Sequence, residues 1–196
     1  MIKSKGTLLL LLLTLCLVMA NTIKAASAPP PTMYDVAGVY NGTSVTSLSV
    51  ASVGSTKWTS LLVCTISALD SNNGTISCTQ PNYGYLNTAA LQIISKGKKM
   101  TWTLDGPALS QMENIITDDL ASWAANNGSY LDTSSAYYDI QTMISTPIGI
   151  VKSKKGIFPT TGTLTIKGFV TGLVDSYSYT RKFSYTTKIT FHQKLN

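Results

Sequence analysis

The sequence predicts a mainly β protein of the α+β class. It is expected to form one antiparallel, strongly curved sheet or small barrel, with one or two helices between the fifth strand and the last two. Three observations support this prediction. Apolar and polar residues alternate along 177–192, as in a strand with one buried face. The turn-forming run Asp70–Gly74 separates two strand-like segments. Apolar residues take up helical spacing over 107–125, between the strand runs.

Residues 1–28 have the layout of a secretory signal peptide. Lys3 and Lys5 form a short positive start, Leu8–Ala20 is an apolar segment, and small residues follow it. The apolar segment has 13 residues, well short of the roughly 20 that a membrane-spanning helix needs. We therefore expect an exported protein, periplasmic or secreted, from which this leader is removed.

Residues 29–34 are predicted to be a proline-rich spacer, because Pro29-Pro30-Pro31 favours a stiff, extended backbone. Residues 35–196 are long enough for a single β-rich domain with a core of its own. Removal of the leader takes three lysines with it and leaves twelve basic residues against nine acidic ones. This modest balance, with one arginine in the chain, argues against a nucleic-acid-binding protein.

The first part of the domain predicts five strands joined by turns. Their ranges are Val36–Ser52, Lys57–Leu69, Thr75–Thr79, Leu86–Ile94 and Met100–Leu104. Cys64 and Cys78 lie symmetrically about Ser71, so a hairpin that turns there sets the two sulfurs opposite each other. In an exported protein this pair is expected to form a structural disulfide. A metal or redox site is disfavoured, since no C-x-x-C spacing occurs and His192 is the only histidine.

The pattern then changes to helical spacing. The apolar residues that recur are Leu109, Met112, Ile116, Leu120 and Trp123. We predict a helix over Pro107–Ala125, with Pro107 in its first turn. A second helix is predicted over Thr133–Ile144, and a strand is the alternative because of Tyr137-Tyr138. Pro147–Pro159 is predicted to be a loop.

Two long strands are expected to close the chain, with a turn at Val174–Ser176 between them. The first covers Thr161–Thr171. In the second, the odd positions carry the apolar residues Tyr177, Tyr179, Phe183, Tyr185, Ile189 and Phe191. Trp102 is expected to join this aromatic face from a neighbouring strand. A packed core is the favoured interpretation of such a face, and a ligand cavity behind it is the alternative.

Arg181 shares the odd positions of this strand, so alternation predicts that its side chain points inward. A buried arginine is costly unless it is paired or bound to a ligand, which makes Arg181 the candidate for an anionic headgroup. The alternative, equally weighted, is that the strand bends or bulges there and lets the side chain reach solvent. The candidate ligand-binding residues are therefore Arg181, Tyr177, Tyr179, Phe183, Tyr185 and Trp102.

The opening strand, Val36-Ala37-Gly38-Val39-Tyr40-Asn41-Gly42-Thr43, resembles the calycin-like (lipocalin-related) exported β-barrel proteins of bacteria, which often begin with a G-x-Y-x-G-T strand. The resemblance covers this strand and the general order of the hairpins. It implies an internal cavity for a small apolar ligand and brings no catalytic residues with it. The helical stretch at Pro107–Ile144 departs from a simple up-and-down barrel.

The sequence predicts no catalytic residue, no metal site and no cofactor. His192 lies on the polar face of the last strand, and no G-x-S-x-G motif supplies a nucleophile for it. Glu113, the only glutamate, is interpreted with Asp118 and Asp119 as part of a solvated helix face rather than as a catalytic carboxylate pair.

We therefore predict an exported, non-enzymatic binding protein that holds a small apolar or lipid-like ligand in a barrel cavity. The alternative is a structural or interaction protein of the periplasm or cell surface with no small-molecule ligand. The lysine clusters Lys96/Lys98/Lys99 and Lys152/Lys154/Lys155 are interpreted as solubilising turn tips. Contact of these lysines with an anionic membrane surface is the minority interpretation.

Overall fold

The sheet follows from the alternation that runs along nearly every strand. The computed structural model describes residues 28–80, 84–104, 106–126, 129–174 and 176–195, and apart from Ala28 the predicted leader lies outside them. The chain divides into two units, Met1–Pro30 and Pro31–Asn196, and all helices and strands described belong to the second. Within the described residues, no helix is long and apolar enough to cross a membrane.

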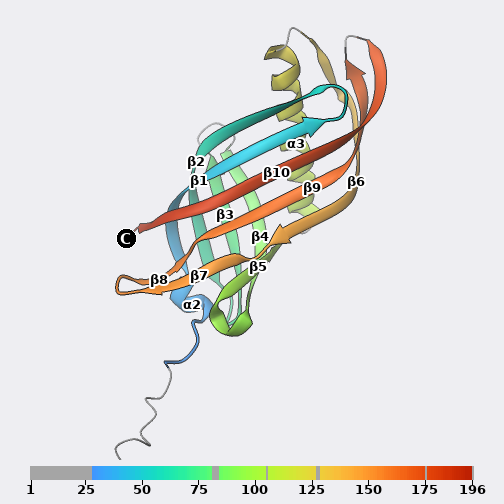
Figure 1. Cartoon of the computed structure of the whole chain (residues 1–196). Helices are drawn as coiled ribbons and strands as arrows, with labels where there is room; N and C mark the ends of the chain where they lie inside the picture. The colour runs from blue at the N-terminus through green and yellow to red at the C-terminus, as the bar shows by residue number, and fades with distance from the viewer. Residues whose placement is uncertain (1–27, 81–83, 105, 127–128, 175, 196) are drawn as a thin grey trace, which may run out of the picture. The chain divides into compact units, whose positions relative to one another are not determined.

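The strands pair antiparallel in the order β6-β9-β10-β1-β2-β3-β4-β5-β7-β8 and curl strongly into a half-barrel (Figure 1). Their bounds are β1 Gly38–Val50, β2 Gly54–Ala68, β3 Asn73–Gln80, β4 Gly84–Ile94, β5 Lys99–Thr103, β6 Leu131–Thr146, β7 Ile148–Ser153, β8 Gly156–Pro159, β9 Thr161–Val174 and β10 Tyr177–Leu195. The helices are α2 Met33–Val36, η1 Ser95–Gly97 and α3 Gly106–Asn126. The prediction of a mainly β fold with a curved antiparallel sheet is confirmed.

The first and last strands of the domain lie side by side at the centre of the sheet. β1 pairs with β10 from Val39↔Leu195 to Val50↔Phe183, and with β2 on its other side. The register of β1 against β10 shifts at Asn41/Gly42. A Cβ atom at Gly42 would lie 2.7 Å from the carbonyl oxygen of Thr190, so the close approach of the two backbones requires glycine.

β5 and β6, which are far apart in the sheet order, come together where β6 runs through Pro147 into β7. Met100 of β5 pairs with Ile148 of β7, immediately after the end of β6. Two hydrogen bonds join β5 to β6 directly. The Trp102 indole N–H donates to the Thr146 carbonyl at 3.0 Å, and the Ser145 hydroxyl donates to the Trp102 carbonyl at 3.0 Å. These bonds hold the open side of the half-barrel together at one end.

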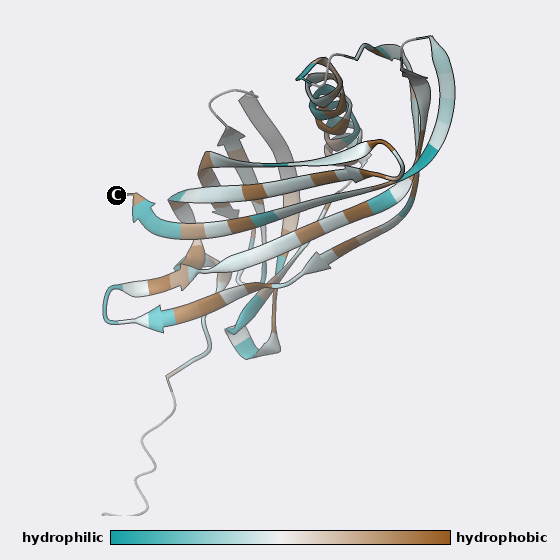
Figure 2. Ribbon diagram, turned by 45° about the horizontal axis from the view of Figure 1, so that its top comes forward, coloured by the Kyte–Doolittle hydropathy of each residue, from teal (hydrophilic) through white to brown (hydrophobic). Residues whose placement is uncertain are grey.

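The core lies on the inner face of the sheet. Leu62, Cys64 and Ile66 of β2 are buried, whereas Leu61 and Val63 between them are exposed, as the pleat of a strand requires. Figure 2 shows the same banding of apolar residues along the long strands. Aromatic pairs in edge-to-face contact link the strands, at Tyr40–Phe191 between β1 and its neighbour β10, and at Trp58–Tyr185 between β2 and β10, on either side of β1.

Helix α3 covers the inner face and contacts β4, β6 and β1. The predicted helix over Pro107–Ala125 is confirmed. Its buried stripe is Ala108, Met112, Ile116, Asp119, Leu120 and Ala124. The prediction that Asp119 faces solvent with Asp118 is wrong, since Asp119 is buried and only Asp118 is exposed. Asp119 stands one turn beyond Ile116 and next to Leu120, on the same helical face as the apolar residues.

The predicted second helix over Thr133–Ile144 is wrong, because these residues belong to strand β6. Ala136, Ile140 and Ile144 are four residues apart, and residues four apart share a face in a strand as well as in a helix. The alternative prediction, a strand indicated by Tyr137-Tyr138, is confirmed. Tyr138 is half-buried and meets Phe183 edge-on at 5.7 Å, whereas its neighbour Tyr137 is exposed.

The predicted loop over Pro147–Pro159 is also wrong, since it forms the β7–β8 hairpin with Ile150↔Pro159 and Ser153↔Gly156 as outermost pairs. Proline is tolerated here because Pro147 precedes β7 and Pro159 ends β8, the last strand of the sheet order.

Helix α2 was not predicted from the sequence. The Asp35 carboxylate accepts a hydrogen bond from the Thr32 backbone N–H at 2.8 Å, and this bond caps the single turn of α2. Met33, the first residue of the helix, is buried.

The predicted disulfide is confirmed. Cys64 and Cys78 are bonded, directly opposite each other in the β2–β3 hairpin, with their Cα atoms 4.0 Å apart. The turn expected around Ser71 lies between them, and the Asp70 carboxylate accepts bonds from the backbone N–H groups of Asn72 and Asn73. A disulfide is consistent with an oxidising location of the kind that export provides.

Replacing both cysteines by alanine is expected to lower the free energy of unfolding by about 3 kcal/mol, because the bridge restricts an unfolded-chain loop between residues 14 apart. Urea unfolding of the oxidised protein, the reduced protein and C64A/C78A measures the effect. The reduced protein should lose a similar amount of stability. Two reactive thiols in the native exported protein would contradict the assignment.

Candidate functional site

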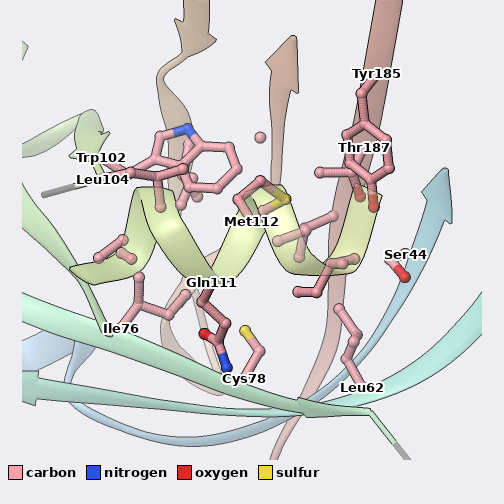
Figure 3. A pocket seen from close by; sticks show the side chains of 16 residues that line it. Ser44, Leu62, Ile76, Cys78, Trp102, Leu104, Gln111, Met112, Tyr185 and Thr187 are labelled. Carbon is pink, nitrogen blue, oxygen red and sulfur yellow. The ribbon is translucent and has the colours of Figure 1, made fainter. Parts of the chain in front are cut away.

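A cavity of about 50 Å³ lies between α3 and the inner face of the sheet (Figure 3). Its walls come from β1, β2, β3, β4, β5, β7, β9 and β10 on one side and from Ala108, Gln111, Met112 and Ile115 of α3 on the other. The site is therefore enclosed by the curl of the sheet and closed over by the helix. Its lining is mostly apolar, with Leu62, Ile76 and Trp102 among the larger contributors.

The cavity exists because the middle of β1 presents small side chains to the core. The inward positions of β1 run from Tyr40 through Gly42, Ser44 and Thr46 to Leu48, and all five are buried. Large residues fill the space at both ends of this series, whereas the small ones at its centre do not reach α3. The space that remains opposite Ser44 is part of the cavity.

Hydroxyl groups mark one wall of the cavity. Ser44 is 2% exposed, and its Oγ has no hydrogen-bond partner in the described part of the chain. The Thr187 hydroxyl also lines the cavity and lies 3.1 Å from the hydroxyl of Thr46, its cross-strand neighbour. Figure 3 shows Ser44 and Thr187 on the same side of the space, with Gln111 projecting from α3 at another. An unpaired buried hydroxyl costs about 1–3 kcal/mol, so Ser44 calls for a partner in this space.

Among the residues that the structure describes, no carboxylate, lysine, arginine or histidine lines the cavity. A charged ligand group would lose its hydration here without gaining a counter-charge, which is strongly unfavourable. The wall offers one free hydroxyl, that of Ser44, among mostly apolar side chains. A neutral ligand with one hydrogen-bonding group is complementary to such a wall.

The size of the cavity limits its occupant. A volume of about 50 Å³ exceeds the roughly 10–15 Å³ that one water requires and falls below the about 150 Å³ of a cavity that holds benzene. The space as it stands therefore fits a ligand of a few heavy atoms or a pair of waters. A longer lipid-like chain would require α3 to move away from the sheet.

The position of α3 is fixed in part by Tyr138 of β6. The Thr117 hydroxyl of α3 donates to the Tyr138 hydroxyl oxygen at 3.0 Å, and the Tyr138 ring packs on Phe183. Burial raises the pKa of Tyr138 to about 12, and burial also raises the pKa of Tyr40 to about 12. Both phenols are therefore neutral, and able to donate, well above pH 10.

Of the candidate ligand-binding residues predicted from the sequence, some line the cavity and others do not. Trp102 and Tyr185 line the cavity, as the cavity interpretation expected. Phe183 is buried but packs against Tyr138, and Tyr179 is half-buried outside the cavity lining. Tyr177 is 79% exposed. The expectation that Tyr177 is buried in the aromatic face is therefore wrong.

Arg181 is exposed as well, and its guanidinium donates to the neighbouring Thr180 carbonyl at 3.0 Å. The reason is not a bend or bulge, because β10 pairs with β9 without a register shift from Tyr177 to Thr190. Instead, β1 ends at Val50, opposite Phe183, so Arg181 has no strand beside it on that side of β10. Alternation assigned the correct face to Arg181, since its partner in β9, Val170, is fully buried, but at this edge the arginine side chain is exposed.

The residues that sequence reasoning missed are Ser44, Gln111 and Met112. A signal for Ser44 is present in the sequence, since Tyr40, Ser44 and Leu48 occupy alternate positions on one face of a strand, which places a hydroxyl at a core position.

His192 lies on the outer face, where its Nε2 is 3.0 Å from the Thr43 hydroxyl. The expectation that this histidine is an exposed polar residue is confirmed.

The tyrosine that holds α3 leads to a prediction about alkaline stability. Because the folded-state pKa of Tyr138 lies above the unfolded value near 10, its contribution is complete below pH 10 and is lost as pH rises through about 12. Unfolding free energies of wild type and Y138F, measured by urea at pH 8, 10 and 11.5, should show a shallower decline for Y138F. Y177F, altered at an exposed tyrosine, should follow wild type. Equal slopes for wild type and Y138F would refute the assignment.

Comparison with known proteins gives no indication of function, so a functional proposal has to start from the inner cavity. No protein-family model, curated protein or solved structure matches this chain.

Proposed function

We propose that this chain is an exported, non-enzymatic binding protein whose inner cavity holds a small, neutral, mostly apolar ligand. The ligand carries one polar group that hydrogen-bonds to Ser44. The observation that carries the proposal is the free, buried Ser44 hydroxyl facing an otherwise apolar space. A bound hydroxyl, carbonyl or ether oxygen would satisfy that group while its carbon skeleton contacts Leu62, Ile76 and Met112.

Export is supported by two independent features. The leader-like pattern of residues 1–28 is the first, and the Cys64–Cys78 disulfide, stable in an oxidising compartment, is the second. The calycin-like resemblance of the opening strand is in keeping with an internal ligand. The volume of the cavity favours a compact ligand over the lipid-like one that the sequence first suggested.

The proposal is tested on the chain expressed with its own leader and purified after export. Native mass spectrometry detects any co-purified ligand. NMR then follows the amide signals of β1 and α3 with three probes: xenon, cyclobutanol and cyclobutanecarboxylate. Xenon and cyclobutanol should shift signals around the cavity, whereas the carboxylate should not, because its charge cannot be paired there. The binding function is wrong if no adduct is seen and neither neutral probe shifts these signals.

The role of Ser44 is tested separately. S44A is expected to weaken cyclobutanol binding about fivefold, which corresponds to about 1 kcal/mol for one hydrogen bond, and to leave xenon binding unchanged. S49A is the matched control, since Ser49 lies on the same strand with its side chain exposed. Unchanged cyclobutanol affinity in S44A would remove the hydroxyl from the proposal but not the cavity.

A second candidate function, an interaction protein, is favoured by one observation. The outer face of β1 and β2 carries an open hollow lined by Asn41, Leu61, Val63 and His192, in which Leu61 is 69% exposed. Exposed apolar side chains beside a hollow are typical of contact surfaces. If this surface is used, L61S/V63S should abolish self-association or partner binding in analytical ultracentrifugation and pull-down measurements without changing the melting temperature.

A further inference from the structure

Two lysine clusters that are far apart in the sequence meet at one end of the half-barrel. Lys96, Lys98 and Lys99 surround the turn between β4 and β5, and Lys152, Lys154 and Lys155 lie in the β7–β8 hairpin. The pairing of β5 with β7 brings them together, since Lys99 pairs with Gly149 and the Ile150 N–H donates to the Lys98 carbonyl at 2.8 Å. We call these six residues the lysine end (Figure 1).

The charges of the lysine end are available to a partner. All six side chains are exposed, and none of them forms an ion pair with a carboxylate among the residues that the structure describes. Figure 2 shows the tip of the β7–β8 hairpin as strongly hydrophilic. Asp35 of α2 lies near this end, since α2 contacts β8 and the charge of Lys152 acts on Asp35.

The positive potential of this end reaches Asp35. Hydrogen bonds from the Thr32 backbone and side chain lower the pKa of Asp35 most, and the charges of Lys152 and Lys194 lower it further. Asp35 lies on α2, which contacts β8. The hairpin lysines, α2 and the end of β10 therefore share one electrostatic environment.

Exposed apolar side chains accompany the lysines. Val151, next to Lys152 in β7, is 49% exposed, and Tyr34 of α2 is 62% exposed. An end of the domain that exposes lysines together with an aliphatic side chain and a tyrosine suits the boundary between lipid headgroups and acyl chains, where tyrosine is favoured. Lysine is a point charge without the planar fork by which arginine grips individual phosphates, so it fits a diffuse anionic surface. The single arginine, Arg181, lies in the part of β10 that extends away from this end.

We propose that the lysine end docks the protein on an anionic phospholipid bilayer, with the six lysines over the headgroups and Val151 and Tyr34 at the interface. The proposal is independent of the cavity, because none of these residues lines it. The attraction is electrostatic, so it falls with rising salt.

The test is sedimentation of the exported, purified protein with vesicles. Binding is expected to vesicles of phosphatidylcholine with one third phosphatidylglycerol, at low salt, and not to pure phosphatidylcholine. At about fivefold per lysine, K152Q/K154Q/K155Q should weaken binding about a hundredfold, and K96Q/K98Q/K99Q should do the same. V151Q, which leaves the charge unchanged, should weaken it by a smaller factor.

The matched control is K57Q/K167Q/K188Q, which removes the same charge from exposed lysines outside the lysine end. It should retain binding within twofold. The proposal is overturned if wild type does not bind the anionic vesicles, if the control loses as much affinity as the two cluster variants, or if single-stranded RNA binds while vesicles do not. Circular dichroism and melting temperatures confirm that each variant is folded.

Discussion

The pairing of β1 with β10 is the constraint on which the rest of the structure depends. It joins the first and last strands of the domain in the middle of the sheet, over the register from Val39↔Leu195 to Val50↔Phe183. The hairpins β1–β2 and β9–β10 are local, but this contact spans nearly the whole domain and makes the separate hairpins one curved surface. Where it ends, at Val50, β10 has no neighbour on that side, although the core continues over β9 and β6 with Val170 and Leu131. The same limit explains why Phe183 is buried while Arg181, two residues earlier, is in solvent.

The inner face of such a curl must be covered, and α3 provides the cover. Its fit is decided by residue size on β1, where Gly42, Ser44 and Thr46 stand at the inward positions between Tyr40 and Leu48. Gly42 is needed for the close approach of β10, so part of the small-residue series is a backbone requirement. Ser44 is different, because an alanine or valine there would fit a core without leaving an unpaired hydroxyl. The chain keeps a polar atom at a core position beside an open space, which is the feature that a ligand, or ordered water, would explain.

Much of this architecture could be predicted from the sequence wherever one local signal determined one outcome. The Asp70–Gly74 turn fixed the β2–β3 register and hence the disulfide, and the apolar spacing from Leu109 to Trp123 predicted α3. The failures came where a signal had two structural meanings. Residues at i and i+4 lie on one face in both a helix and a strand, so β6 could not be distinguished from a helix by that spacing. The alternation along β10 predicted the face on which Arg181 lies. Its exposure, however, depends on where β1, far away in the sequence, ends.

The charges of the domain also show why a net value conceals function. After removal of the leader the balance is modest, twelve basic residues against nine acidic, but six of the lysines gather at one end of the domain. The other end carries both signs, because Asp139 of β6 and Lys182 of β10 pair with the same residue of β9, Phe169. A local positive potential of this kind turns the lysine end toward an anionic surface before any contact forms. Sequence order hid this arrangement because more than fifty residues separate the two lysine clusters, and only the pairing of β5 with β7 brings them together.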